Sequence, residues 1–170
     1  MLLAAALLAP LAVLAQTLPL SLADPKLDLR EAGTGLLRYW GLQIYQARLW
    51  VSNGRFNIDQ PFALGMRYVR AFSGAAIAQS SSDEIRRLNL GTEAQRTQWD
   101  EAMRRVFPEI KAGDELLGMH WPQKGLEFFA NGRTLGVIED PAFARAFFAI
   151  WFDPRTRSTE LRSALLAGSQ

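Results

Sequence analysis

The sequence predicts an α+β fold, in which helices gather on one face of an antiparallel sheet. Segments with strand character come first, segments with helical periodicity occupy the middle, strands then return, and helices close the 170-residue chain. Because strands and helices are grouped rather than alternating one by one, an antiparallel sheet is favoured over a parallel one. The length suits a single domain.

The first sheet segments are expected between residues 36 and 72. The run "LLRYWGLQIYQARLWV", 36–51, is rich in aromatic and β-branched residues and predicts one or two strands interrupted at Gly41. Asn53-Gly54 predicts a tight turn. Residues 62–72 alternate in polarity, so one face of that strand carries Phe62, Leu64, Met66 and Tyr68.

Two helices are expected next. Residues 73–89, "SGAAIAQSSSDEIRRLN", have helical character, and their triple serine indicates a break with Ser82 or Asp83 as a new N-cap. Residues 92–110, "TEAQRTQWDEAMRRVFPEI", predict a stronger helix that starts with a Thr92/Gln95 capping box and ends at Pro108.

The last third of the chain predicts three short antiparallel strands and two helices. Residues 111–140 contain the strands, with turns near 123–125 and at Asn131-Gly132. Asp140 is a natural N-cap for the apolar helix that follows, with Pro141 at its first position. A final helix is expected from Ser158 to Gly168.

Composition argues against several classes of site. The chain has no cysteine, which removes disulfides, thiol nucleophiles and cysteine-based zinc sites. Its one histidine, His120, has no partner at metal-ligand spacing, so a structural or surface role is expected and no metal site. Neither a G-x-S-x-G elbow nor a phosphate-binding glycine loop occurs, and no cofactor is expected. The 19 basic and 17 acidic residues are spread along the chain, which argues against a nucleic-acid partner.

The chain opens on an apolar segment without charge. Residues 1–15 have the length of a signal peptide, and "VLA" offers a cleavage site before Gln16, although no basic residue follows Met1. An uncleaved anchor is the alternative, but the run is short for a membrane span. We therefore expect a periplasmic or secreted protein with no stable membrane span once the signal is removed. A polar entry segment, 16–32, would then lead into one domain, 33–168.

Several segments together resemble the bacterial chalcone isomerase-like family. The resemblance runs in order from about Gly33 to Gly168, and its most specific part is the run from Asn131 to Trp151. The segments that carry it are "GLQIYQARLWV", "YVRAFSG", "FPEIKAGD", "FFANGRTLGVIEDPAFARAFFAIWFDP" and "LRSALLAG".

The resemblance implies an open-faced sandwich, a large antiparallel sheet packed against a layer of helices with a ligand cleft between them. The family includes enzymes that cyclise chalcones and relatives that bind fatty acids without catalysis. In both groups an arginine early in the sheet contacts the ligand, and "GTGLLRYWG" places Arg38 near that position. Tyr45 stands where the enzymes carry a threonine, which argues against chalcone cyclisation and leaves Tyr45 as a partner for a carboxylate.

Further candidates come from the residues themselves. On a regular strand Arg70 would share the alternating face of Tyr68, so its guanidinium must pair with an acid, reach solvent or contact a ligand. Phe147 and Trp151 belong to an apolar helix that either fills a plain core or lines an apolar ligand pocket. The candidate ligand-binding residues are therefore Arg38, Tyr45, Tyr68, Arg70, Phe147 and Trp151.

Three functions stay open on the sequence alone. The favoured one is non-catalytic binding of a fatty acid or a similar amphipathic, lipid-like carboxylate. The second is an isomerase acting on an enone, in which Arg38 stabilises the developing anion and Tyr45 donates a hydrogen bond. The third is a structural or interaction module whose cleft is filled by its own side chains.

Overall fold

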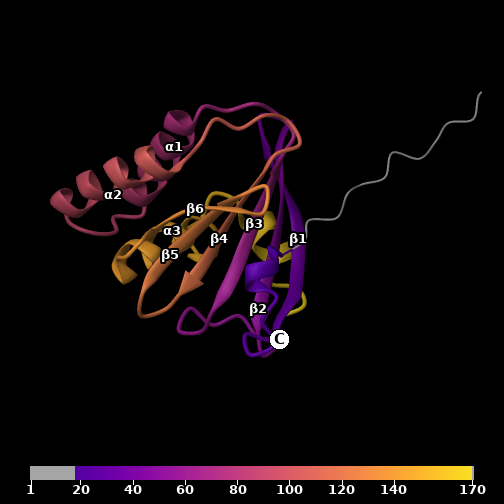
Figure 1. Ribbon diagram of the computed structural model, residues 1–170. Coiled ribbons are helices and arrows are strands. Elements are labelled where there is room, and N and C mark those ends of the chain that lie inside the picture. Colours follow the sequence, from indigo (N-terminus) through magenta and orange to yellow (C-terminus); the bar gives the residue numbers. More distant parts are fainter. Residues whose placement is uncertain (1–17, 170) are drawn as a thin grey trace, which may run out of the picture.

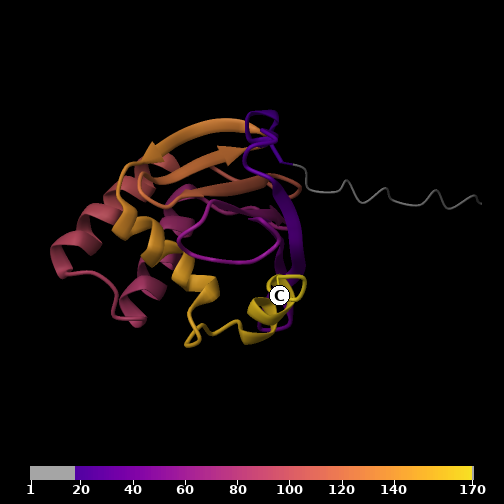
Figure 2. The same cartoon turned by 90° about the horizontal axis from the view of Figure 1, so that it is seen from below.

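The computed structural model describes residues 18–169, so the predictions for a signal peptide and for cleavage before Gln16 lie outside the described residues. Within that range, six antiparallel strands form one sheet in the order of the sequence (Figure 1). The sheet curves around the helices that cover its inner face (Figure 2). The predicted α+β open-faced sandwich is confirmed.

The sheet is a meander of hairpins, interrupted once by a pair of helices. Its strands are β1 (Leu29–Tyr39), β2 (Leu42–Ser52), β3 (Phe62–Tyr68), β4 (Glu115–Trp121), β5 (Gly125–Ala130) and β6 (Arg133–Ile138). The predicted interruption at Gly41 is a two-residue turn, in which Trp40 and Gly41 both have positive φ, 50° and 76°. β1 begins four residues before Gly33, inside the predicted entry segment.

A short 3-10 helix, η1 (Leu20–Leu22), and four α-helices complete the fold: α1 (Gly74–Arg87), α2 (Glu93–Val106), α3 (Pro141–Phe152) and α4 (Thr159–Leu165). The predicted break at the triple serine is wrong, because α1 runs through it from an N-cap at Ser73. Inside the helix, the Ser81 hydroxyl donates to the Ile77 carbonyl at 2.9 Å and the Ser82 hydroxyl donates to Asp100 at 2.7 Å. Both hydroxyls are thus satisfied without a cap. In residues 18–169 no helix is long and apolar enough to cross a membrane.

Capping residues fix where α2 and α3 begin, as the sequence predicts. Thr92 and Gln95 form the reciprocal capping box of α2. One carboxylate oxygen of Asp140 accepts the amides of Ala142 and Phe143, and the other accepts Trp99 Nε1 at 2.8 Å. Asp140 therefore starts α3 and also ties it to α2.

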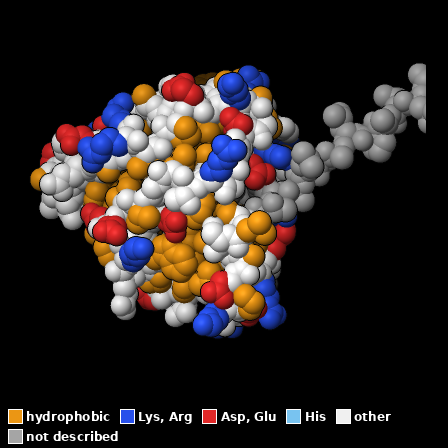
Figure 3. Space-filling view, viewed as in Figure 1, with side chains coloured by type: hydrophobic (Ala, Val, Ile, Leu, Met, Phe, Trp, Pro, Cys, Tyr) orange, Lys and Arg blue, Asp and Glu red, His pale blue; other side chains and the backbone are white. Residues whose placement is uncertain are grey.

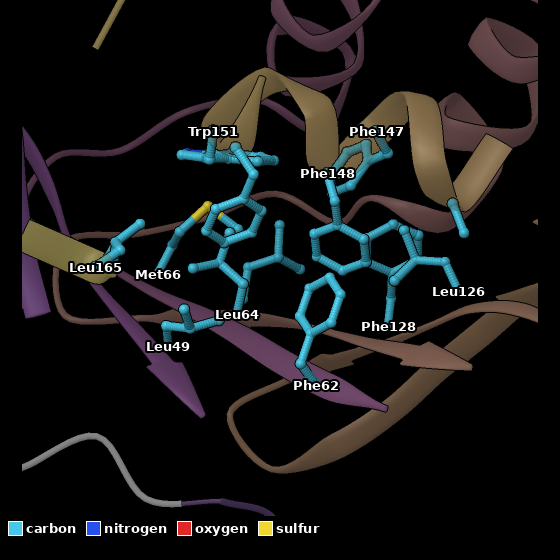
Figure 4. Close-up of a cluster of buried hydrophobic side chains, with 14 of the residues drawn as sticks. Leu49, Phe62, Leu64, Met66, Leu126, Phe128, Phe147, Phe148, Trp151 and Leu165 are labelled. Atoms are coloured by element: carbon cyan, nitrogen blue, oxygen red, sulfur yellow. The ribbon is translucent and has the colours of Figure 1, made fainter. Parts of the chain in front are cut away.

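The inner core lies between the sheet and α3. Phe147 and Phe148 of α3 face the rings that rise from β3 and β5 (Figure 4). The Phe62 and Phe148 ring centroids are 4.6 Å apart, and those of Phe128 and Phe147 are 5.4 Å apart. The aromatic side chains of α3 thus pack on other rings in a continuous core.

A second, smaller core lies on the opposite face of the sheet. Leu22 of η1 packs there against buried side chains of the sheet, namely Trp50, Ala63, Leu117, Met119 and Phe129. Other apolar side chains remain visible on this face (Figure 3). The segment predicted only as a polar entry is therefore a cover for the sheet, because Leu22, with Leu18, Leu27 and Leu29, packs on its apolar outer face.

Candidate functional site

An open depression of about 790 Å³ lies at the end of the sheet where β1 turns into β2. In Figure 1 this end is at the top, where the chain leaves β3 for α1 and later returns to β4. Its lining residues are Arg38, Gly41, Leu42, Gln43, Val69 and Arg70. Two guanidinium groups and a few apolar side chains thus share one concave surface.

Irregular strand pairing places the two arginines. The register shifts between Leu37 and Arg38, so that Arg38 stands opposite Gln43 on β2. β3 ends at Tyr68, one residue before Val69, whose amide donates to the Ile44 carbonyl at 3.0 Å. Arg70 is therefore exposed beyond the strand rather than on its alternating face, and its Nε donates to the Gln43 carbonyl at 3.2 Å.

The charge of the depression is uncompensated. Its lining contains two arginines and no acidic residue. Arg38 is exposed and has no hydrogen-bond or ion-pair partner in residues 18–169. An arginine offers a planar fork of donors that matches a carboxylate or a phosphate. The depression is therefore suited to an anionic group.

Tyr45 and Tyr68 lie further along the strands, opposite each other on β2 and β3. Both side chains are buried, with ring centroids 5.4 Å apart. Burial raises the pKa of Tyr45, and a hydrogen bond from Trp151 Nε1 to its hydroxyl, 2.9 Å long, acts in the opposite direction. Burial also raises the pKa of Tyr68, and the neighbouring Tyr45 adds to that effect. Both phenols are therefore neutral hydrogen-bonding groups at physiological pH.

The six predicted site residues thus separate into two groups. Arg38 and Arg70 line the depression. Tyr45, Tyr68, Phe147 and Trp151 belong to the inner core. Within the described residues the hydroxyl of Tyr68, the residue before Val69 of the lining, has no hydrogen-bond partner.

Sequence reasoning missed Leu42, Gln43 and Val69 as lining residues. Their position depends on the turn at Trp40-Gly41, of which the sequence predicts only the interruption at Gly41, and on the register shift beside Arg38, which is not readable from residue type. A usable signal was Gln43, which is the first polar residue after the turn.

His120 lies far from this site, on β4. Its side chain is fully buried, Nε2 is 2.8 Å from the Ile58 carbonyl, and its ring is 4.7 Å from that of Phe62. Of the structural and surface roles that the sequence allows, this is the structural one. Among residues 18–169 no cluster of three or more His, Asp or Glu side chains could hold a metal ion.

Comparison with known proteins identifies the family. Residues 14–167 match the chalcone isomerase-like family, and the chain belongs to it. A comparison with curated protein sequences finds no match. Among solved structures, the fold is similar to a crystal structure of a fatty-acid binding protein from Arabidopsis thaliana. The TM-score is 0.62 at 11% identity, over 84% of this chain and 88% of that chain, and likeness at this identity concerns the fold alone.

Proposed function

We propose that the protein binds a fatty acid or a similar amphipathic carboxylate without turning it over, with the head group held by Arg38 and Arg70. The observation that carries this proposal is the unpaired guanidinium of Arg38, which together with Arg70 lines a depression that has no acidic residue. A carboxylate would complete the donors of both arginines with charge-assisted hydrogen bonds.

The rest of the depression offers contacts for the part of the ligand next to its head group. Its volume is about 790 Å³, and it is open to solvent. Leu42 and Val69 offer apolar contact for the first part of the chain, and the Tyr68 hydroxyl is the next donor along β3. The fatty-acid binding named for the similar plant structure supports the same ligand class.

Binding without turnover is favoured by the chemistry of the lining. Arginine and glutamine do not change protonation near neutral pH, so they can hold an anion but cannot shuttle a proton. In the alternative, an isomerase acting on an enone, Tyr45 would donate to the substrate. Its hydroxyl is buried in the inner core and Tyr45 is not among the residues that line the depression, which favours binding over that role.

Export belongs to the same proposal. The uncharged apolar leader supports a periplasmic or secreted protein whose mature chain begins near Gln16. N-terminal sequencing of the protein from its native host tests this, and an intact Met1 on a membrane-bound protein would refute it.

Calorimetric titration of the delipidated protein with a long-chain fatty acid tests the ligand. Arg38→Ala should weaken binding by about 1.5–3 kcal/mol, the usual contribution of a hydrogen bond to a charged group, or roughly one to two decades in Kd. Arg38→Lys should recover part of that loss, because lysine keeps the charge without the fork. Arg133→Ala is the matched control, since Arg133 is an exposed arginine on the far edge strand.

Two results would overturn the proposal. Equal affinities of wild type and Arg38→Ala would remove Arg38 from the site. Turnover of a chalcone by wild type, lost in Arg38→Ala, would make the protein an isomerase.

A further inference from the structure

Most of the exposed large apolar side chains in the described part of the chain are concentrated at one end of the sheet. Six large apolar side chains are exposed in residues 18–169, and all but Leu20 belong to the β1–β2 hairpin or to the segment beside it: Leu36, Tyr39, Trp40, Leu42 and Val69. Trp40, at the apex of the hairpin, is 87% exposed and Tyr39 is 66% exposed. Such a cluster on a folded protein indicates an interaction surface.

The turn at the apex contains Trp40, a residue that is unfavourable in the backbone conformation of this turn. Both central residues have positive φ, which defines a type I′ turn and favours Asn-Gly. The chain uses Asn-Gly at two other places with the same pair of positive φ values, Asn53-Gly54 and Asn131-Gly132. At the exposed apex it instead has Trp40-Gly41, although a bulky residue is disfavoured in that conformation. Turn stability therefore does not account for Trp40.

Positive charge flanks the apex. Arg38 precedes the two exposed aromatic residues, and Arg70 reaches the same hairpin through the Gln43 carbonyl. Neither arginine has an acidic partner in the described residues, and no acid lines the depression between them. The apex thus combines amphipathic aromatic rings with uncompensated cations.

We propose that the β1–β2 hairpin docks on an anionic lipid surface, with Trp40 and Tyr39 in the interface and Arg38 and Arg70 at the head groups. Tryptophan and tyrosine favour the membrane–water interface, and basic residues are attracted to anionic lipids. Interfacial binding grows with buried apolar area and with this attraction. A two-residue apex offers little area for a protein partner, whose stable interfaces need roughly 1,000 Å² or more.

Docking on a lipid surface is a function beyond ligand binding and does not depend on it. The depression opens beside the apex, since it is lined by Gly41 of the turn and by Leu42, which follows the turn. Docking would therefore bring the mouth of the depression to the lipid surface, where an amphipathic ligand is stored. The two functions share Arg38 and Arg70, but Trp40 separates them, because it is not among the residues that line the depression.

Vesicle cosedimentation tests the docking. Wild type should bind vesicles of equal parts phosphatidylcholine and phosphatidylglycerol, bind weakly to phosphatidylcholine alone, and lose binding as salt is raised. Trp40→Asn should reduce partitioning by about tenfold or more, since burying one large aromatic side chain contributes on that order. Its melting temperature should equal or exceed that of wild type, because asparagine suits the turn.

Two controls keep docking apart from ligand binding and from self-association. Leu20→Asn removes an equally exposed apolar side chain elsewhere and should leave partitioning unchanged. Trp40→Asn and wild type should have the same affinity for free fatty acid in solution, so a loss of vesicle binding cannot be a loss of ligand binding. Three results would each overturn the proposal. Trp40→Asn could partition onto vesicles as wild type does, or wild type could bind neutral and anionic vesicles equally. Alternatively, wild type could be a dimer that binds no vesicles and that Trp40→Asn converts to a monomer.

Discussion

The hydrogen bond between Tyr45 and Trp151 connects the sheet to α3 at the inner end of the candidate site. The indole Nε1 donates to the Tyr45 hydroxyl at 2.9 Å, and both side chains are buried. A buried donor that loses its acceptor keeps the full cost of leaving water. The contact therefore contributes to stability mainly by satisfying the indole.

Tyr45→Phe should consequently lower the free energy of unfolding by about 1–3 kcal/mol, the cost of an unsatisfied buried donor. Urea denaturation measures it. In a double-mutant cycle with Trp151→Phe, the second substitution should cost less in the Tyr45→Phe background than in wild type. Strict additivity of the two losses would show that the hydrogen bond is energetically irrelevant.

Burial of His120 changes its pKa and so makes the stability of the protein depend on pH. Desolvation lowers its pKa, and the hydrogen bond to the Ile58 carbonyl opposes this effect. The contact assigns the proton to Nε2. Nδ1 is buried and finds no partner among the described residues. A second proton on Nδ1 would therefore have no acceptor.

The folded protein should lose stability as the pH falls below about 6.5, the ordinary histidine value. In that window the unfolded chain binds a proton that the folded chain, with its lowered pKa, does not, so acid favours unfolding. His120→Phe removes the pH dependence of stability that comes from this histidine and keeps an aromatic ring against Phe62. Urea denaturation at pH 7.5 and 5.5 should show a smaller pH effect in the variant, and an equal effect would contradict the assignment.

At the scale of elements, α4 packs closely against β1. A Cβ on Gly33 would lie 2.2 Å from the Ala164 carbonyl oxygen, whereas one on Gly35 would lie 2.7 Å from the end of the Leu161 side chain. Just beyond the helix, the Gly168 amide donates to the Ala32 carbonyl at 2.8 Å. The glycines of "GTG" thus permit backbone approach between these two elements.

Gly33→Ala should therefore be costly, by roughly 1–3 kcal/mol or more as for overpacked cores, because a backbone carbonyl must move. Gly35→Ala is the matched comparison and should cost less, because the end of a leucine side chain can change rotamer. Thermal unfolding of both variants checks the order. The reverse order would mean that α4 adjusts freely on β1.

Local chemistry predicted some elements well and others poorly. The Thr92 and Asp140 caps are confirmed because a cap depends on a few neighbouring residues. The helix break at the triple serine is wrong because the Ser82 hydroxyl finds Asp100, which is distant in sequence. Contacts between distant residues also limited the prediction of the site. A family resemblance pointed to Arg38, but the residues beside it in the depression are set by strand register, which depends on the whole hairpin.

At the scale of the whole molecule, the sheet has two apolar faces and two different covers. α3 and α4 cover the inner face, and the chain before β1 covers part of the outer face. That second cover is short and rests largely on Leu22, which is 3% exposed in η1. If the leader is cleaved before Gln16 as proposed, the mature chain keeps this segment.

Leu22→Ala should destabilise the protein by about 2–5 kcal/mol, the usual range for a buried leucine. It should also raise binding of an apolar fluorescent dye, since Trp50 and Phe129 would lose part of their cover. Leu20→Ala is the control within the same helical turn, because Leu20 is 94% exposed, and it should change stability by less than about 0.5 kcal/mol. Urea denaturation of the mature protein distinguishes the two variants. Equal stabilities would mean that the segment before β1 only lies against the sheet, and that the outer face is stable without it.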